Sequence, residues 1–283
     1  MKWKGREESG NIEDRRGISG GKMIAGGTLG TLAIVVIVWL LGGDPSQIIN
    51  SLQSQGQETA VADSSVIRAE ADQAEFASVV LKDTEDIWHM IFKENGRTYV
   101  EPKMVLFSGS AETACGFSSS ATGPFYCPGD QKVYIDLSFL EDLQQKLGAT
   151  GDFAKAYIIA HEVGHHVQNQ LGITDKLSNM RGRTSESEYN NASVRLELQA
   201  DFLAGVWAHY AEKTKDILEE GDVEEALNAA AAVGDDRIQM KSQGYVVPDA
   251  FTHGTSEQRR RWFLKGYKTG DMNEGDTFSA SEL

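Results

Sequence analysis

The strongest feature of the hydrophobic pattern is an uncharged apolar stretch over residues 23–41. A helix of this length, at about 1.5 Å per residue, just crosses a hydrocarbon core of about 30 Å. A buried core helix would show a polar face, which this stretch lacks. A cleaved signal peptide would have a shorter apolar run and a small-residue cleavage site, where this chain reads LLGGDP. We therefore expect an uncleaved signal-anchor that forms a single transmembrane helix, with a cleaved signal as the alternative.

The charges around this stretch predict its orientation. Residues 1–22 contain six basic side chains, whereas the first charge after the anchor is Asp44. Basic flanks remain in the cytoplasm. We therefore expect a cytoplasmic segment at 1–22 and an extracytoplasmic remainder, facing the periplasm from a bacterial inner membrane or exposed at the cell surface. Residues 42–70, rich in Gln, Ser, Gly and Ala, are expected to form a stalk, and residues 71–283 form the domain.

Helical periodicity dominates this domain. Apolar residues recur at helical spacing over 70–92, and helices are also expected over 138–147, 152–170, 187–213 and 223–233. Short extended segments are expected over 98–107 and 132–137, the second with strand alternation. The polar tail after Tyr267 is expected to fray.

Composition narrows the function classes. The formal net charge is −15, with 27 basic against 42 acidic residues, which argues against nucleic acid as a partner because phosphate binding needs a basic face. Two cysteines, Cys115 and Cys127, are too few for a disulfide framework. In an oxidising compartment they are expected to form one disulfide bond. Zinc binding by these cysteines is the weaker alternative, since their spacing matches no zinc finger.

The segment AYIIAHEVGHHVQNQ, residues 156–170, carries the candidate chemistry. His161 and His165 are four residues apart, so a helix places both imidazoles on one face. Glu162 follows the first histidine, where its carboxylate could reach a metal-bound water. This is the H-E-x-x-H arrangement of zinc peptidases, and imidazole nitrogens suit Zn²⁺ with an open fourth position. The alternative is a pair of histidines that only satisfy hydrogen bonds in the core. Burying two histidines and a glutamate on one helix without partners is costly, and a bound metal would explain their presence.

A third ligand must come from elsewhere in the chain. Gln168 and Leu171 stand where the longer H-E-x-x-H-x-x-G-x-x-H motif has Gly and His. A glutamate on a second helix would instead complete a His₂Glu set. Glu197, in the otherwise apolar segment VRLELQADFLAGVWA, is the best candidate. Asp201 lies one turn further along the same face, where it could accept the second N–H of a ligand histidine.

These residues resemble the bacterial "putative neutral zinc metallopeptidase" family, the YpfJ-type membrane proteins. The similarity covers nearly the whole chain and includes WKGREESGNIEDRRG, the apolar anchor, CGFSSSATGPFYCPGDQKVYIDLSFL, GDFAKAYIIAHEVGHHVQNQLG, ELQADFLAGVWA and HGTSEQRRRWFLKGY. The resemblance implies an α+β, zincin-like fold, with a small mixed sheet packed on the active-site helix and a second helix that brings Glu197. With the motif, it predicts a zinc metalloendopeptidase with one catalytic Zn²⁺ that acts on a peptide or protein substrate.

The expected mechanism uses a zinc-activated water held at the His₂Glu set, with a pKa of about 7. Glu162 would take its proton during attack on a peptide carbonyl and deliver it to the leaving amine. A further donor would stabilise the oxyanion. His253 is the first candidate for this donor, with Arg259 as its supporting partner, as in the integral-membrane gluzincin peptidases that share the HEVGH and ELQAD pair. A surface histidine in a loop is the alternative for His253.

The remaining histidines are expected to be structural. His166 follows a ligand directly and points elsewhere on the helix, while His89 and His209 lie in apolar helical runs typical of core positions.

The loop between the two cysteines is expected to line the substrate cleft, braced by the disulfide. In zincin-like folds an edge strand before the zinc helix pairs with extended substrate, and the strand expected at 132–137 follows this loop. The alternative function is a zinc-stabilised, non-catalytic binding or scaffold protein of the cell envelope. A structural zinc is usually closed by four protein ligands, so three ligands together with Glu162 favour the enzyme.

Overall fold

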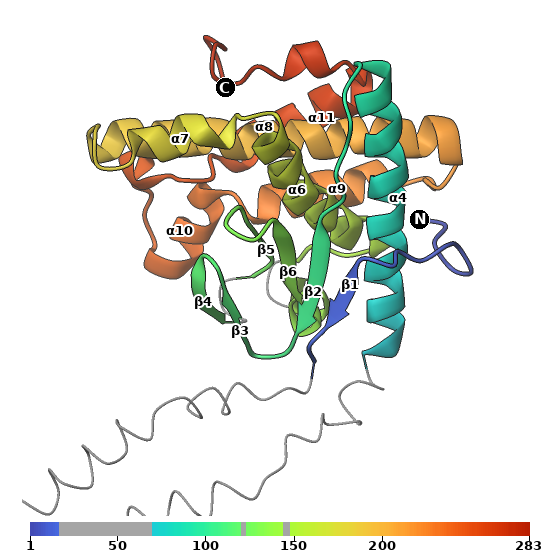
Figure 1. Cartoon of the computed structure of the whole chain (residues 1–283). Helices are drawn as coiled ribbons and strands as arrows, with labels where there is room; N and C mark the ends of the chain where they lie inside the picture. Colours follow the sequence, from blue (N-terminus) through green and yellow to red (C-terminus); the bar gives the residue numbers. More distant parts are fainter. Residues whose placement is uncertain (17–69, 120–122, 144–147) are drawn as a thin grey trace, which may run out of the picture.

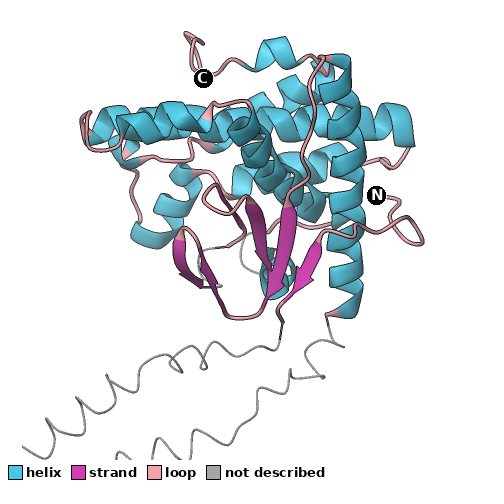
Figure 2. Ribbon diagram, in the orientation of Figure 1, coloured by secondary structure: helices cyan, strands magenta, loops and turns pink. Residues whose placement is uncertain are grey.

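The computed structural model describes residues 1–16, 70–119, 123–143 and 148–283. In this part of the chain a small sheet lies at one end of a larger set of helices (Figures 1 and 2). The strands are β1 (Ile12–Asp14), β2 (Lys103–Phe107), β3 (Ser110–Thr113), β4 (Gly116–Ser119), β5 (Phe125–Cys127) and β6 (Lys132–Asp136). The helices are α4 (Ala71–Glu94), α5 (Leu137–Asp142), α6 (Asp152–Gln170), α7 (Thr174–Met180), α8 (Glu186–Lys215), α9 (Asp222–Ala232), α10 (Asp235–Gln243) and α11 (Ser256–Thr269), with 3₁₀ turns η4 (Pro248–Ala250) and η5 (Met272–Gly275). The expected α+β class is confirmed.

The main sheet has the strand order β1-β2-β6-β5. The first three strands are parallel, and β5 runs antiparallel to β6. Four consecutive residues of β2 and of β6 are buried, as expected for central strands covered on both faces. The strand expected at 132–137 is therefore not the edge of the sheet. The two outer strands are β1 and β5, and β5 lies inside the loop between the cysteines.

Helix α6 is the centre of the helical part. It contacts α4, α8, α9, β5 and β6, and its residues Phe153 to Gly164 are buried with the exception of Lys155. An apolar run of this kind forms a helix that is surrounded by other elements rather than exposed on one side. Polar side chains on α6 therefore face protein, and each needs a partner.

Helices α8 and α11 cross at two glycines. A Cβ at Gly205 would lie 2.1 Å from the carbonyl oxygen of Phe263, and one at Gly266 would lie 2.0 Å from that of Phe202. These distances leave no room for a methyl group, so the two backbones touch directly. The crossing fixes α11 against the helix that carries Glu197.

We expect Gly205→Ala to lower the free energy of unfolding by about 1–3 kcal/mol, because overpacking outweighs the gain of about 1 kcal/mol in helix propensity. Urea denaturation measures this change. Gly10→Ala is the control, since a Cβ there meets nothing within 4 Å. Equal stabilities for the two variants would contradict the close crossing.

The C-terminal tail is ordered by its contacts with α8, contrary to the expected fraying. Arg195 donates to the carbonyl oxygens of Thr277, Phe278 and Ala280. The Thr277 hydroxyl donates to the carbonyl oxygen of Arg195 at 2.6 Å, and Thr277 is fully buried. The tail has few apolar residues, so its polar sequence gave no sign of this attachment.

The N-terminal segment also belongs to this folded body. Strand β1 pairs with β2, and Met1 and Trp3 lie in the main hydrophobic core. The sequence-based division treats residues 1–22 as a separate segment, but residues 1–16 are not separate from the domain. The expected anchor at 23–41 and nearly all of the expected stalk lie outside the described residues. Among the residues that are described, no helix is both long enough and apolar enough to span a membrane.

Candidate metal centre

Helices α6 and α8 bring the two parts of the predicted site together. His161 and His165 project from α6, and Glu197 projects from α8. Gly164 lies between the two histidines at the point where α8 passes. A Cβ there would lie 3.0 Å from the carbonyl oxygen of Ala200 and 3.3 Å from its Cα. The glycine of HEVGH therefore allows the close approach that places Glu197 opposite both imidazoles.

The three predicted ligand side chains converge. His161 Nε2 lies 3.2 Å from Glu197 Oε2, and His165 Nε2 lies 3.5 Å from Glu197 Oε1. One ligand atom from each residue falls within 4.8 Å of the others. None of the three side chains is more than 16% exposed. The structure thus assembles a group that could hold a metal ion. Glu197 comes 36 positions after His161 and 32 positions after His165 in the sequence.

Asp201 fixes the first imidazole, as its position on α8 predicts. His161 Nδ1 lies 2.8 Å from Asp201 Oδ1, so the Nδ1–H donates to the carboxylate and Nε2 is left to face Glu197. Tyr157 donates its hydroxyl to the same oxygen at 2.5 Å. Asp201 is fully buried, and its negative charge needs a cation.

Arg259 supplies that cation. Its Nε lies 2.8 Å from Asp201 Oδ2, and its Nη2 lies 2.9 Å from Asp201 Oδ1. This two-point pairing between a guanidinium and a carboxylate fixes orientation as well as charge. The predicted partnership of Arg259 with His253 is therefore replaced by a pairing with Asp201, through which Arg259 orients His161.

Gln168 fixes the second imidazole. His165 Nδ1 lies 2.9 Å from Gln168 Oε1. The amide nitrogen of Gln168 donates to the carbonyl oxygen of Leu196 and to Gln199 Oε1, at 2.7 and 3.1 Å. Because the amide NH₂ is engaged in this way, its oxygen accepts the Nδ1–H of His165. Nε2 of this ring is then also free to bind a metal.

The charges of the cluster are matched. Burial lowers the pKa of His161, but the carboxylates of Asp201 and Glu197 outweigh burial and raise it to about 10. Burial raises the pKa of Glu197, but His165 and His161 outweigh burial and hold it well below its usual range. Glu197 is therefore ionised, as a ligand must be, and protons compete with a metal for the imidazoles.

Glu162 lies beside the ligand cluster and is only 8% exposed. Burial raises the pKa of its carboxyl group, while the neighbouring His161 and His165 oppose that change. A raised carboxyl pKa in a site is suited to accepting and returning a proton near neutral pH.

The donor set fits Zn²⁺. Two imidazole Nε2 atoms and one carboxylate are the ligands of a His₂Glu zinc site, and each imidazole has its other nitrogen held by a side-chain oxygen. The described residues offer three ligands, and a zinc ion held by them would keep a fourth position for water or substrate, as catalytic zinc sites do.

His253 lies next to the cluster without being one of its three metal-capable residues. Its backbone N–H donates to Asp235 at 2.6 Å, and its Nδ1 lies 3.2 Å from the same carboxylate. A Cβ at Gly254 would meet Val194 and Leu198, which flank the third ligand on α8, at 3.2 and 3.3 Å. The side chain of His253 is 51% exposed, as in the alternative of a surface histidine in a loop. The hydrogen bond to Asp235 raises the pKa of His253, which favours the imidazolium form as a donor.

The remaining histidines differ from one another. His166 is structural, as predicted: it is fully buried, with Nδ1 3.0 Å from the Tyr126 hydroxyl and Nε2 2.7 Å from the carbonyl oxygen of Val100. His209 is half-buried and bonds the carbonyl oxygen of Tyr267. The core position predicted for His89 is wrong, because its side chain is 48% exposed and pairs with Glu101.

The loop before α6 has the predicted disulfide, which joins Cys115 and Cys127. Strand β5 ends at Cys127 and contacts α6. Tyr126, in the middle of β5, bonds His166 and Asn169 on α6 through its hydroxyl. The edge strand is thus attached to the histidine-bearing helix.

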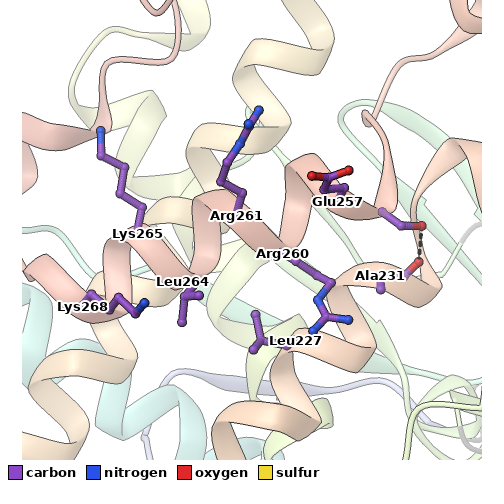
Figure 3. Close-up of a pocket in the computed structure, with 9 residues that line it drawn as sticks. Leu227, Ala231, Glu257, Arg260, Arg261, Leu264, Lys265 and Lys268 are labelled. Carbon is purple, nitrogen blue, oxygen red and sulfur yellow. Dashed lines mark hydrogen bonds between the residues drawn. The ribbon is translucent and has the colours of Figure 1, made fainter. Parts of the chain in front are cut away.

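A separate hollow of about 740 Å³ lies between α9 and α11 (Figure 3). It is lined by Leu227, Ala231, Ser256, Glu257, Arg260, Arg261, Leu264, Lys265 and Lys268. None of the three ligand residues lines it, so its basic side chains are not part of the candidate centre.

Sequence reasoning missed two supporting residues, Tyr157 and Gln168. Tyr157 lies four residues before His161, so its hydroxyl in an apolar helix is on the ligand face, and this spacing was the available signal. Gln168 lies three residues after His165, which also places it on that face. Gln168 stands at a position where the longer motif has Gly, which hid its role beside His165.

Comparison with known proteins identifies a family. A family described as "putative neutral zinc metallopeptidase" matches residues 1–278. "Uncharacterized protein YpfJ" of Escherichia coli K12 is 48% identical over 291 aligned residues, covering 99% of this chain and all of that protein. "Uncharacterized protein Rv2575" of Mycobacterium tuberculosis is 42% identical over 258 residues, covering 86% of each chain. No solved structure matches this chain.

Proposed function

Because this chain belongs to the putative neutral zinc metallopeptidase family, we propose that it is a zinc-dependent endopeptidase with His161, His165 and Glu197 as its metal ligands. The observation that carries the proposal is the convergence of one ligand atom from each of these three side chains within 4.8 Å, with the buried Glu162 close enough to interact electrostatically with all three. A structural zinc is usually closed by four protein ligands, and the described residues offer three.

Different residues of the chain have different roles in the proposed hydrolysis. A bound zinc ion supplies Lewis acidity and lowers the pKa of a coordinated water to about 7. Glu162 accepts the proton of the attacking water and returns it to the leaving amine. Asp201 and Gln168 hold the ligand histidines in the tautomer that presents Nε2. Strand β5, an outer strand of the main sheet that contacts α6, is proposed to pair with extended substrate.

Metal removal tests this proposal. We expect a chelator to abolish cleavage of an unfolded protein such as casein, and about one equivalent of zinc per chain to restore it. Cleavage by the metal-free chain would contradict the zinc mechanism. If the chain binds zinc at the three ligands but cleaves no peptide, the non-catalytic envelope scaffold replaces the enzyme.

His253 is proposed to donate a hydrogen bond to the oxyanion. We expect His253→Gln to lower kcat about 10²-fold or more, as for loss of one oxyanion donor, with zinc content unchanged. The raised pKa of His253 fixes the direction of the pH dependence of the rate. The protonated donor form is present at low pH and is lost as the pH rises through that pKa. The wild-type rate should therefore have an alkaline limb that the variant lacks. His89→Gln, at an exposed histidine, is the control, and equal kcat values would remove His253 from the site.

We also propose that residues 23–41 attach the protein to a membrane and that the domain works outside the cytoplasm. The apolar composition of this segment supports the first statement. The disulfide supports the second, since such bonds persist in oxidising compartments.

A further inference from the structure

We propose that residues 1–16 are bound as an integral clamp of the domain, which ties α4, α6 and α9 together. It follows that the N-terminus and the metal centre lie on the same side of any membrane the chain enters. This inference is independent of the proposed enzymatic function. It replaces the orientation expected from the basic flank, with a cytoplasmic N-terminus and the domain on the opposite side.

The first two residues contact the segment that leads into α9. The Met1 nitrogen lies 3.2 Å from Asp222 Oδ1, and Asp222 is only 4% exposed. The backbone N–H of Lys2 donates to the carbonyl oxygen of Ile217 at 2.8 Å. The start of the segment is therefore bound through its backbone as well as through its side chains.

Trp3 and Ser9 contact α6 and α4. Trp3 Nε1 donates to Asp152, in the first turn of α6, at 2.9 Å. The Trp3 ring packs edge-on against Phe76 of α4, with ring centroids 5.4 Å apart. Ser9 Oγ donates to the buried Glu85 of α4 at 2.6 Å. The segment therefore ties the start of α6 to α4 and α9.

Release of this segment would be costly. Glu85 is only 2% exposed, and its carboxylate would lose the donors Ser9 and Asn11. Leaving a buried acceptor without its donors costs about 1–3 kcal/mol, and more when the acceptor is charged. Met1 and Trp3 would also leave the hydrophobic core. A docked state is thus part of the stable fold rather than a surface contact.

The described residues on either side of the segment at positions 17–69 lie close together. Residues before it form β1, where Ile12 pairs with Met104 of β2. Arg16, its last described neighbour on that side, has Nη1 3.5 Å from Oε2 of Glu70, the first described residue on the other side. Both ends leave the body at the same edge, near β1 and the start of α4 (Figure 1). A single crossing of a hydrocarbon core of about 30 Å would separate these two residues by at least that distance.

Labelling of single cysteines in intact cells tests the sidedness. We would compare full-length Glu7→Cys with Tyr245→Cys, using a membrane-impermeant maleimide, since these side chains are 79% and 59% exposed. The unsubstituted chain is the background control, because its two cysteines form the disulfide. In permeabilised cells both positions react. In intact cells we expect both to react or both to be protected. Reaction at only one of the two positions would overturn the proposal.

A second measurement tests the clamp itself. We expect Trp3→Ala to lower the Tm of the full chain by roughly 5–10 °C, because the ring leaves the core and Asp152 loses its donor. Lys2→Gln is the matched control, since its ion pair with Asp216 is exposed on both sides. A Trp3→Ala chain with the Tm of the control would overturn the clamp.

Discussion

Replacement of Glu162 by Gln is expected to lower kcat for peptide hydrolysis by about 10²–10⁴-fold, the usual contribution of a positioned general base and acid. The change removes the proton-accepting carboxylate and keeps the size of the side chain. Glu162 is not one of the three converging ligands, so zinc content should remain the same. Kinetics on a fluorogenic peptide, together with metal analysis of the same sample, measure both effects.

The control for this variant is Glu94→Gln, at an exposed carboxylate on the last residue of α4. It should leave kcat and zinc content unchanged. A Glu162→Gln protein that still turns over at the rate of the control would rule out Glu162 as the base. Loss of zinc from it would show that Glu162 belongs to the ligand set instead.

The second large effect is expected on stability. Arg259→Met should lower the free energy of unfolding by about 3–5 kcal/mol, because it leaves the fully buried Asp201 carboxylate without its cation. Arg259→Lys should recover only part of the loss, since an ammonium group cannot make the two-point contact. Urea denaturation of the full chain measures the difference.

Arg260→Met is the matched control on the next residue of α11, where the side chain is exposed. We expect its unfolding free energy to stay within about 0.5 kcal/mol of the unsubstituted chain. Equal losses for the two variants would contradict the role assigned to the pair of Arg259 and Asp201. The Arg259 variant should also bind zinc more weakly, since outer partners of ligand histidines commonly contribute 10–100-fold to metal affinity.

Helix α6 could be predicted because its signals are local. Its apolar run and the glycines around it give a helix over 152–170, and the structure has α6 at Asp152–Gln170. The spacing of His161 and His165 fixes their common face without any tertiary information. Glu197 and Asp201 were also within reach, because carboxylates in an apolar helix need partners.

Other parts depend on contacts that no local pattern records. Helix α10 has a polar sequence, DDRIQMKSQ, with no apolar stripe, so periodicity could not reveal it. Strand β1 has only three residues, and its place is set by pairing with β2, about 90 positions away. The partner of Arg259 follows from the crossing of α8 and α11 at Gly205 and Gly266, which sequence spacing does not encode.

The basic N-terminal segment has two arginines with partners inside the domain. The charges of this segment predicted a cytoplasmic flank. In the structure Arg6 pairs with Asp83 at 2.6 Å and Arg16 pairs with Asp14 at 2.7 Å. These two charges are therefore explained by the fold, and the orientation stays a prediction.

The central claim is that His161, His165 and Glu197 together bind one zinc ion, and zinc stoichiometry of the purified full chain tests it most directly. We expect about one zinc per chain, and loss of most of it in Glu197→Ala, while Glu257→Ala on the exposed side of α11 keeps it. A chain that binds no zinc, or a Glu197→Ala protein that retains a full equivalent, would contradict the account.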